Sequence, residues 1–158
     1  MSAPDEDGVA PPIPLRMAIA VLALVGLFIA VYLTLHALGL LPLAACTVGG
    51  GCDRVQSSRF SHIAGVPVAL VGAVGYLAIF VTAWLGTTPR FATAPWVSRL
   101  LLAFGATAFA FSGYLTALEA WVIHAWCPYC ITSAILATLI FLLSLAQLRT
   151  LRRSQSDR

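Results

Sequence analysis

Four cysteines stand in two close pairs along this chain of 158 residues. The later pair, Cys127 and Cys130, brackets a proline and a tyrosine. At the start of a helix, this i, i+3 spacing places both sulfurs on one side, where the helix dipole and free backbone N–H groups favour a thiolate. The pattern is typical of a dithiol that opens and closes a disulfide.

The earlier pair, Cys46 and Cys52, surrounds three successive glycines, residues 49–51. Glycine gives the backbone freedom for one sulfur to face a soluble partner while the other reaches the second pair. Disulfide exchange moves two electrons per step through mixed disulfides. The two pairs together therefore predict a relay.

The composition indicates that lipid surrounds most of the chain. Sixty per cent of the residues are hydrophobic and 9% are charged, and the mean hydropathy is +0.94, beyond what a soluble domain of this length can bury. Four apolar segments, at about residues 17–38, 67–86, 100–120 and 127–148, can cross the membrane as helices. The predicted fold class is all-α, an integral membrane four-helix bundle.

The remaining segments are polar. We expect a disordered cytoplasmic tail at residues 1–16, a capping loop at 39–66 and a basic cytoplasmic tail at 149–158. Arginines near the span ends favour cytoplasmic termini. Seven lie on that side (Arg16, Arg90, Arg99, Arg149, Arg152, Arg153 and Arg158) and two on the other (Arg54 and Arg59). All four cysteines are then expected on the oxidising, extracytoplasmic side, the periplasmic side in a bacterium.

The final electron acceptor is predicted to be a membrane quinone, either menaquinone or ubiquinone. It takes two electrons within the bilayer, and the sequence has neither a histidine pair for haem nor a GxGxxG nucleotide fingerprint. The arginines sit at element ends rather than in a patch, so nucleic acid is not implied as a partner.

The order of these features resembles the vitamin K epoxide reductase family, over nearly the whole chain after residue 16. The residues that carry the resemblance are Cys46-x5-Cys52, Asp53-Arg54-Val55-Gln56-Ser57-Ser58-Arg59, Gly65-x-Pro67, Gly72, Tyr76 and Cys127-Pro128-Tyr129-Cys130.

The resemblance implies a role for each cysteine. Cys46 would exchange with a thioredoxin-fold partner, Cys52 would attack Cys127, and Cys130 would lie beside the quinone ring. Ser58, with Ser57 as the alternative, would be the serine near the shuttling cysteine.

Three residues of the second apolar segment are assigned to the quinone pocket. They are Gly72, Tyr76 and Phe80. A small residue leaves room for a flat ring, although close packing between helices would also account for the glycine. Contact with lipid would also account for the two aromatic residues.

Departures from the family pattern refine the expected activity. Vertebrate members contact the quinone through a tyrosine and an asparagine, and the matching positions here are Ala134 and Val68. This favours quinone-driven disulfide formation over vitamin K epoxide reduction. Many bacterial members continue into a fused thioredoxin-like domain, whereas this chain stops soon after Leu148, so we expect a separate, soluble DsbA-like partner.

The cysteines also fit several different roles. They could bind zinc in a non-enzymatic membrane protein, although Cys46-x5-Cys52 is wider than usual zinc spacing. A purely structural disulfide, or lipidation of Cys46 after Leu43-Ala44-Ala45, are further alternatives. The DsbB family performs the same chemistry with the cysteine pairs in the opposite order.

Four ionisable residues near the same face are also candidates. Glu119 is the only charge in the third apolar segment, and either a proton relay or an interfacial residue would explain it. His36, His62 and His124 are each candidate proton donors or plain interface residues.

Overall fold

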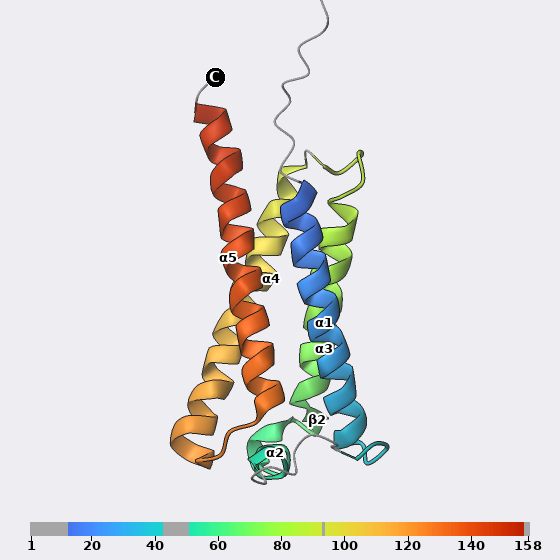
Figure 1. The fold of residues 1–158 in the computed structure, drawn as a ribbon, viewed down its shortest axis with the longest axis vertical. Coiled ribbons are helices and arrows are strands. Elements are labelled where there is room, and N and C mark those ends of the chain that lie inside the picture. The colour runs from blue at the N-terminus through green and yellow to red at the C-terminus, as the bar shows by residue number, and fades with distance from the viewer. Residues whose placement is uncertain (1–12, 43–50, 93, 157–158) are drawn as a thin grey trace, which may run out of the picture.

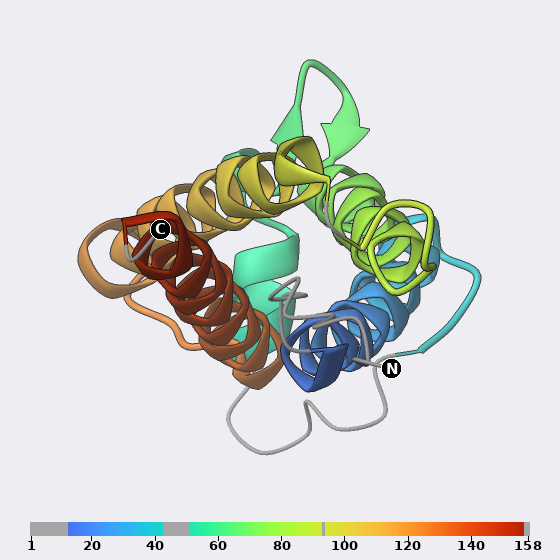
Figure 2. The same cartoon turned by 90° about the horizontal axis from the view of Figure 1, so that it is seen from above.

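A computed structural model describes residues 13–42, 51–92 and 94–156 and confirms the all-α membrane bundle. Four long helices stand side by side (Figure 1), and each is long and apolar enough to cross a membrane. They are α1 (Ile13–Ala37), α3 (Val68–Leu85), α4 (Pro95–Leu118) and α5 (Pro128–Ser156). Viewed along the bundle axis they follow one another around a ring, and α2 lies across one end (Figure 2).

Several helices extend beyond the apolar segments. Helix α4 begins at Pro95 rather than near residue 100, because proline fits the first helical position without losing a hydrogen bond. Helix α5 continues to Ser156, past the expected span end at 148. Residues 13–16, expected in a disordered tail, are the first turn of α1. Residues 1–12 of that tail lie outside the described residues.

Arg16 fixes the first turn of α1 against the other long helices. Its side chain is 1% exposed, and its guanidinium donates to the Gly86 carbonyl and to Ser98 Oγ (3.3 Å). With the amide of Gln147 oriented to satisfy the hydrogen-bond network, its oxygen accepts from Arg16 Nε (2.7 Å). Because Gly86 follows α3, Ser98 lies on α4 and Gln147 on α5, this one side chain joins all four long helices.

We expect the substitution Arg16→Leu to lower the free energy of unfolding by about 1–3 kcal/mol, since it leaves buried hydrogen-bonding partners unsatisfied. Thermal unfolding of the detergent-solubilised protein measures the loss. Arg99→Leu is the matched control, because it removes the same charge from an exposed position at the same end of the bundle. Equal unfolding temperatures for the two variants would contradict the structural role of Arg16.

The segment between α1 and α3 caps the other end of the bundle (Figure 1). It contains α2 (Gly51–Gln56), the 3-10 turn η1 (Arg59–Ser61) and an antiparallel pair of short strands, β1 (His62–Ile63) and β2 (Val66–Pro67). Ala64 and Gly65, both with positive φ, make the two-residue turn between the strands. The part of the expected capping loop after residue 50 therefore consists mostly of short regular elements that lead directly into α3.

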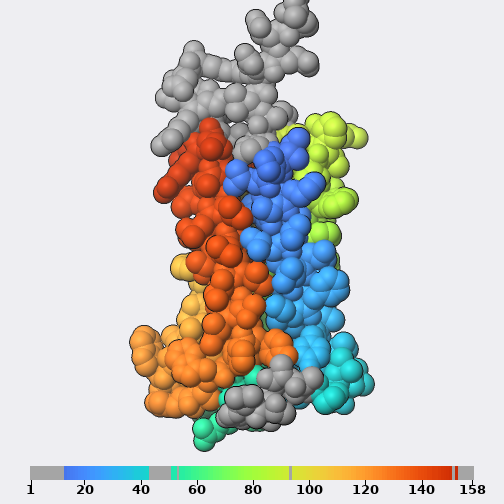
Figure 3. All heavy atoms as spheres, in the orientation of Figure 1, coloured from blue at the N-terminus to red at the C-terminus, as the bar shows by residue number. Residues whose placement is uncertain are grey.

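The side chains of α1 and α5 meet along one face of the molecule (Figure 3). Beneath that face the main core is made by buried side chains of α1, α3, α4 and α5, including Ile19, Ile79, Leu101 and Ile140. This core fills the bundle away from α2. It therefore provides a rigid frame for the capped end, where the cysteines lie.

Candidate active site

Helix α2 brings Cys52 against the start of α5. Cys52 is 1% exposed and Cys127 is 0% exposed. The two pack in one small buried cluster, with Val55, Tyr129 and Cys130 against it. Cys52 is disulfide-bonded, whereas Cys127 and Cys130 are free. The structure thus places an oxidised sulfur of the earlier pair beside a reduced later pair. Cys46 lies outside the described residues.

Gly51 allows this close approach. A Cβ atom built on Gly51 would lie 2.3 Å from the Trp126 carbonyl oxygen, a backbone atom that no side-chain rotation can move away. Only glycine therefore lets the first residue of α2 contact the backbone that precedes Cys127. The position of Cys52 depends on this contact.

The two sulfurs of the later pair differ in their surroundings. Cys127 stands just before α5, and Cys130 lies in its first turn. A hydrogen bond from the Cys130 thiol lowers the pKa of the Cys127 thiol, despite the opposing effects of burial and of the nearby Glu119. Cys127 is therefore the more readily ionised partner, and Cys130 holds the proton between them.

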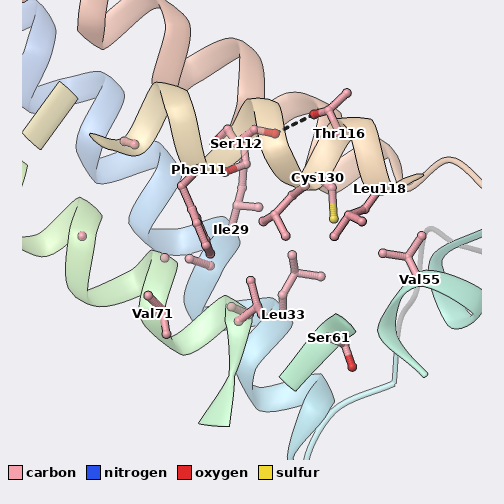
Figure 4. Close-up of a pocket in the computed structure, with 18 of the residues that line it drawn as sticks. Ile29, Leu33, Val55, Ser61, Val71, Phe111, Ser112, Thr116, Leu118 and Cys130 are labelled. Atoms are coloured by element: carbon pink, nitrogen blue, oxygen red, sulfur yellow. Dashed lines mark hydrogen bonds between the residues drawn. The ribbon is translucent and has the colours of Figure 1, made fainter. Parts of the chain in front are cut away.

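A cavity of about 310 Å³ lies next to Cys130 inside the capped end. Its walls are mainly apolar and come from α1, α2, α3, α4 and α5, with Cys130 and Leu33 among the side chains seen in Figure 4. Cys127 is not among the residues that line it. The volume is at the lower end of the range for small-molecule sites, so one flat ring fits better than a large ligand.

Two of the three residues expected at the quinone pocket line this cavity. Gly72 and Tyr76 do so, and the Tyr76 hydroxyl donates to the Ser133 carbonyl (2.9 Å) in the turn after Cys130. Gly26 makes room for that ring, because a Cβ there would lie 2.4 Å from Tyr76 Cε1. The structure does not bring Phe80 to the cavity. It lies one helical turn further from the capped end, packed against the core and 6.0 Å from the Trp84 ring.

Ser58 lines the cavity, and its expected role near the shuttling cysteine stays a prediction because Cys46 is outside the described residues. Its hydroxyl donates to the Val55 carbonyl (2.7 Å) and so closes the end of α2. Ser57, the alternative, is exposed and does not line the cavity. Val68 lines the cavity with an apolar side chain.

Glu119 is the residue whose importance the sequence left undecided. It begins a π-helical turn, η2 (Glu119–Ile123), between α4 and α5. Its side chain is 3% exposed and lines the cavity. One carboxyl oxygen accepts from the Cys127 N–H (3.1 Å), and the carboxyl group also hydrogen-bonds the Cys130 thiol. The sequence feature that could have identified Glu119 is that it is the only charged residue in its apolar segment.

The three histidines do not line the cavity. Their rings lie at the capped end of the bundle, where they contact the Leu41 carbonyl, the Ser61 hydroxyl and the Val122 carbonyl. Within residues 13–42, 51–92 and 94–156, no group of three or more His, Cys, Asp or Glu side chains is placed to hold a metal ion.

Comparison with known protein families gives one match of wide extent. The model of the vitamin K epoxide reductase family matches residues 17–145 of the chain. This range includes all four cysteines, the capping elements and the apolar part of every long helix.

Proposed function

The chain belongs to the vitamin K epoxide reductase family of membrane oxidoreductases, and from this we propose that it oxidises a thioredoxin-fold protein and reduces a membrane quinone. The family is associated with quinones in general, and the four apolar helices fit a multi-pass membrane protein. The cavity supports a quinone, because its apolar walls suit the ring and the reduced Cys130 is the sulfur that lines it.

One observation carries the proposal: the two sulfurs of the later pair face different neighbours. Cys127 packs against Cys52, whereas Cys130 lines the cavity. Electrons can therefore enter the pair at one sulfur and leave at the other. A structural disulfide or a zinc cage would not need this division. A disulfide-bonded Cys52 also has no thiolate to offer a metal.

Each step of the proposed path moves two electrons. A partner thiolate attacks Cys46, the bond between Cys46 and Cys52 breaks, and the second partner thiol closes the partner's own disulfide. When the later pair is oxidised, the freed Cys52 thiolate attacks Cys127, breaks the Cys127–Cys130 bond and releases the Cys130 thiolate. The Cys46 thiolate then attacks Cys52, restores the bond between Cys46 and Cys52 and releases Cys127, which leaves Cys127 and Cys130 reduced. Finally, this dithiol becomes a disulfide while the bound quinone supplies the two-electron, two-proton acceptor that leaves as quinol.

The proposed orientation has the cysteines outside the cytoplasm. Arg90, Arg99 and Arg149 lie towards the end of the bundle opposite α2, whereas Arg54 and Arg59 lie in the cap. The excess of arginine at the uncapped end favours its placement in the cytoplasm. Val68 adds support for disulfide formation over epoxide reduction, since it offers no polar group to the cavity.

Purified protein in detergent, given a reduced thioredoxin-fold protein and a soluble menaquinone or ubiquinone analogue, should reduce the quinone with turnover. Quinone absorbance follows the reaction. Each ingredient is left out in turn as a control. If neither quinone is reduced, or if reduction proceeds equally without the partner, the proposed function is wrong.

The variant Cys52→Ala should also trap the partner. We would load Cys46 as a mixed disulfide with a small thiol and add a partner that keeps one active-site cysteine. The partner thiolate displaces the small thiol, and no Cys52 remains to release it, so a covalent adduct should persist on non-reducing electrophoresis. The matched variant is Cys46→Ala, loaded at Cys52. An equal yield from both variants would show that the partner has no preference for Cys46 and would contradict the proposed entry point.

A further inference from the structure

Glu119 contacts both the reacting sulfur and the cavity. Among the described residues that line the cavity it is the only acid, and the lining contains no arginine or histidine to pair with it. Burial of a carboxyl group without a cationic partner is unfavourable. A merely structural acceptor for the Cys127 N–H would not require an ionisable group. The unfavourable burial of the Glu119 carboxyl group suggests that the site uses its ability to bind a proton.

The π-helical turn puts the carboxyl group there. The Ala125 N–H donates to the Glu119 carbonyl (3.2 Å), and His124 adopts a left-handed conformation, so the chain folds back sharply after η2. The Glu119 side chain consequently reaches the first turn of the next helix. Turns of this kind often occur at functional sites. Here the result is that the Cys130 thiol lies within hydrogen-bonding reach of two groups, the Cys127 sulfur and the Glu119 carboxyl group, and its single proton can be given to either.

We propose that Glu119 is the catalytic base that removes the proton from Cys130 and delivers it to the quinone bound in the cavity. The inference rests on the proposed function. Oxidation of the dithiol breaks two S–H bonds, forms one S–S bond and releases two electrons and two protons. Glu119 takes one proton from Cys130, so the electron pair can leave through this sulfur while the Cys127 thiolate closes the disulfide.

The carboxylic acid then gives its proton to a quinone oxygen and returns to the carboxylate. The second proton of the quinol comes from water, which has already taken the proton of Cys127, the more acidic thiol. The two electrons and two protons on the quinol therefore balance those lost by the dithiol. Glu119 suits this transfer because one carboxyl group contacts the thiol and also lines the cavity.

The first test is a single-turnover reaction, in which the protein is reduced beforehand and then mixed with a quinone. Glu119→Gln keeps an oxygen that can accept from the Cys127 N–H but cannot take a proton. We expect it to slow the reaction about a hundredfold at neutral pH. The rate should rise towards wild type as pH increases and hydroxide replaces the base. Glu119→Asp should recover part of the rate.

Ser144→Ala is the matched control, because Ser144 is also a buried polar residue but lies on α5 away from the cavity. Among the described residues, Cys127 and Cys130 are the titratable groups that contact Glu119, and Tyr76 lines the same cavity; all three remain in every variant. A wild-type rate for Glu119→Gln would overturn the inference. So would a slow rate with an unchanged pH profile, which indicates a structural role.

A second measurement does not need a quinone. A small disulfide reagent oxidises Cys127 and Cys130, and the infrared difference spectrum of this step should contain a carboxyl signal in the wild type that is absent from Glu119→Gln. No carboxyl signal in the wild type would overturn the inference. If the infrared signal is present but the wild type reduces no quinone, the proposed function fails while the proton transfer from Cys130 stands.

Discussion

Replacement of Cys130 by alanine should abolish quinone reduction, with a loss of several orders of magnitude. Among the described residues, Cys130 is the only one with a sulfur atom that lines the cavity, and Cys127 is fully buried on the other side of the pair. Without the Cys130 sulfur, the electron pair has no route into the cavity. Losses of this size are usual when the reacting group of an enzyme is removed. Quinone absorbance with the reduced partner present measures the effect.

Two controls separate this chemical loss from damage to the site. Quenching of tryptophan fluorescence by the quinone should persist in Cys130→Ala, because alanine leaves the cavity open. In a Cys46→Ala, Cys52→Ala background, Cys130→Ala also removes the hydrogen bond that lowers the pKa of Cys127. The thiolate absorbance of Cys127 should then develop at higher pH. If Cys130→Ala kept the rate and Cys127→Ala lost it, the order of the two sulfurs would be reversed.

Local sequence features were sufficient to predict the bundle. Uninterrupted apolar segments identify membrane helices because lipid demands that every backbone group be satisfied within the helix. The CxxC spacing likewise places two sulfurs at one helix start, which is where Cys127 and Cys130 lie. These features depend on neighbouring residues only, and neighbouring residues are what a sequence displays directly.

Features that depend on distant partners were harder to predict. Arg16 was assigned to a tail because it is a charged residue just before the apolar segment, and the sequence does not display its partners, which lie just after α3, on α4 and on α5. The burial of Glu119 depends on a π-helical turn that no local sequence pattern predicts. Phe80 follows Tyr76 by one helical turn, but its neighbour Ile79 lines the cavity instead, because packing between helices decides which side chains of α3 face it.

The glycine at the start of α2 leads to the second large effect. Gly51→Ala should lower partner-driven quinone reduction by about a hundredfold, because its Cβ would clash with the Trp126 carbonyl oxygen. Relief of that clash requires α2 to move away, and α2 carries Cys52. Disulfide exchange needs direct contact between sulfurs, and a displacement of about 1 Å at reacting groups can cost this much in rate. Rapid mixing with the reduced partner measures the effect.

The same variant should leave the last step intact. When Cys127 and Cys130 are reduced chemically beforehand, one turnover of quinone reduction does not involve Cys52. The rate of this reaction in Gly51→Ala should therefore match the wild-type rate. Gly113→Ala is the matched control, since a Cβ there meets no atom within 4 Å and both rates should be unchanged. Equal slowing of both reactions by Gly51→Ala would indicate general disruption of the fold. A change in neither reaction would show that close docking of α2 is unnecessary, and the path from Cys52 to Cys127 would have to be abandoned.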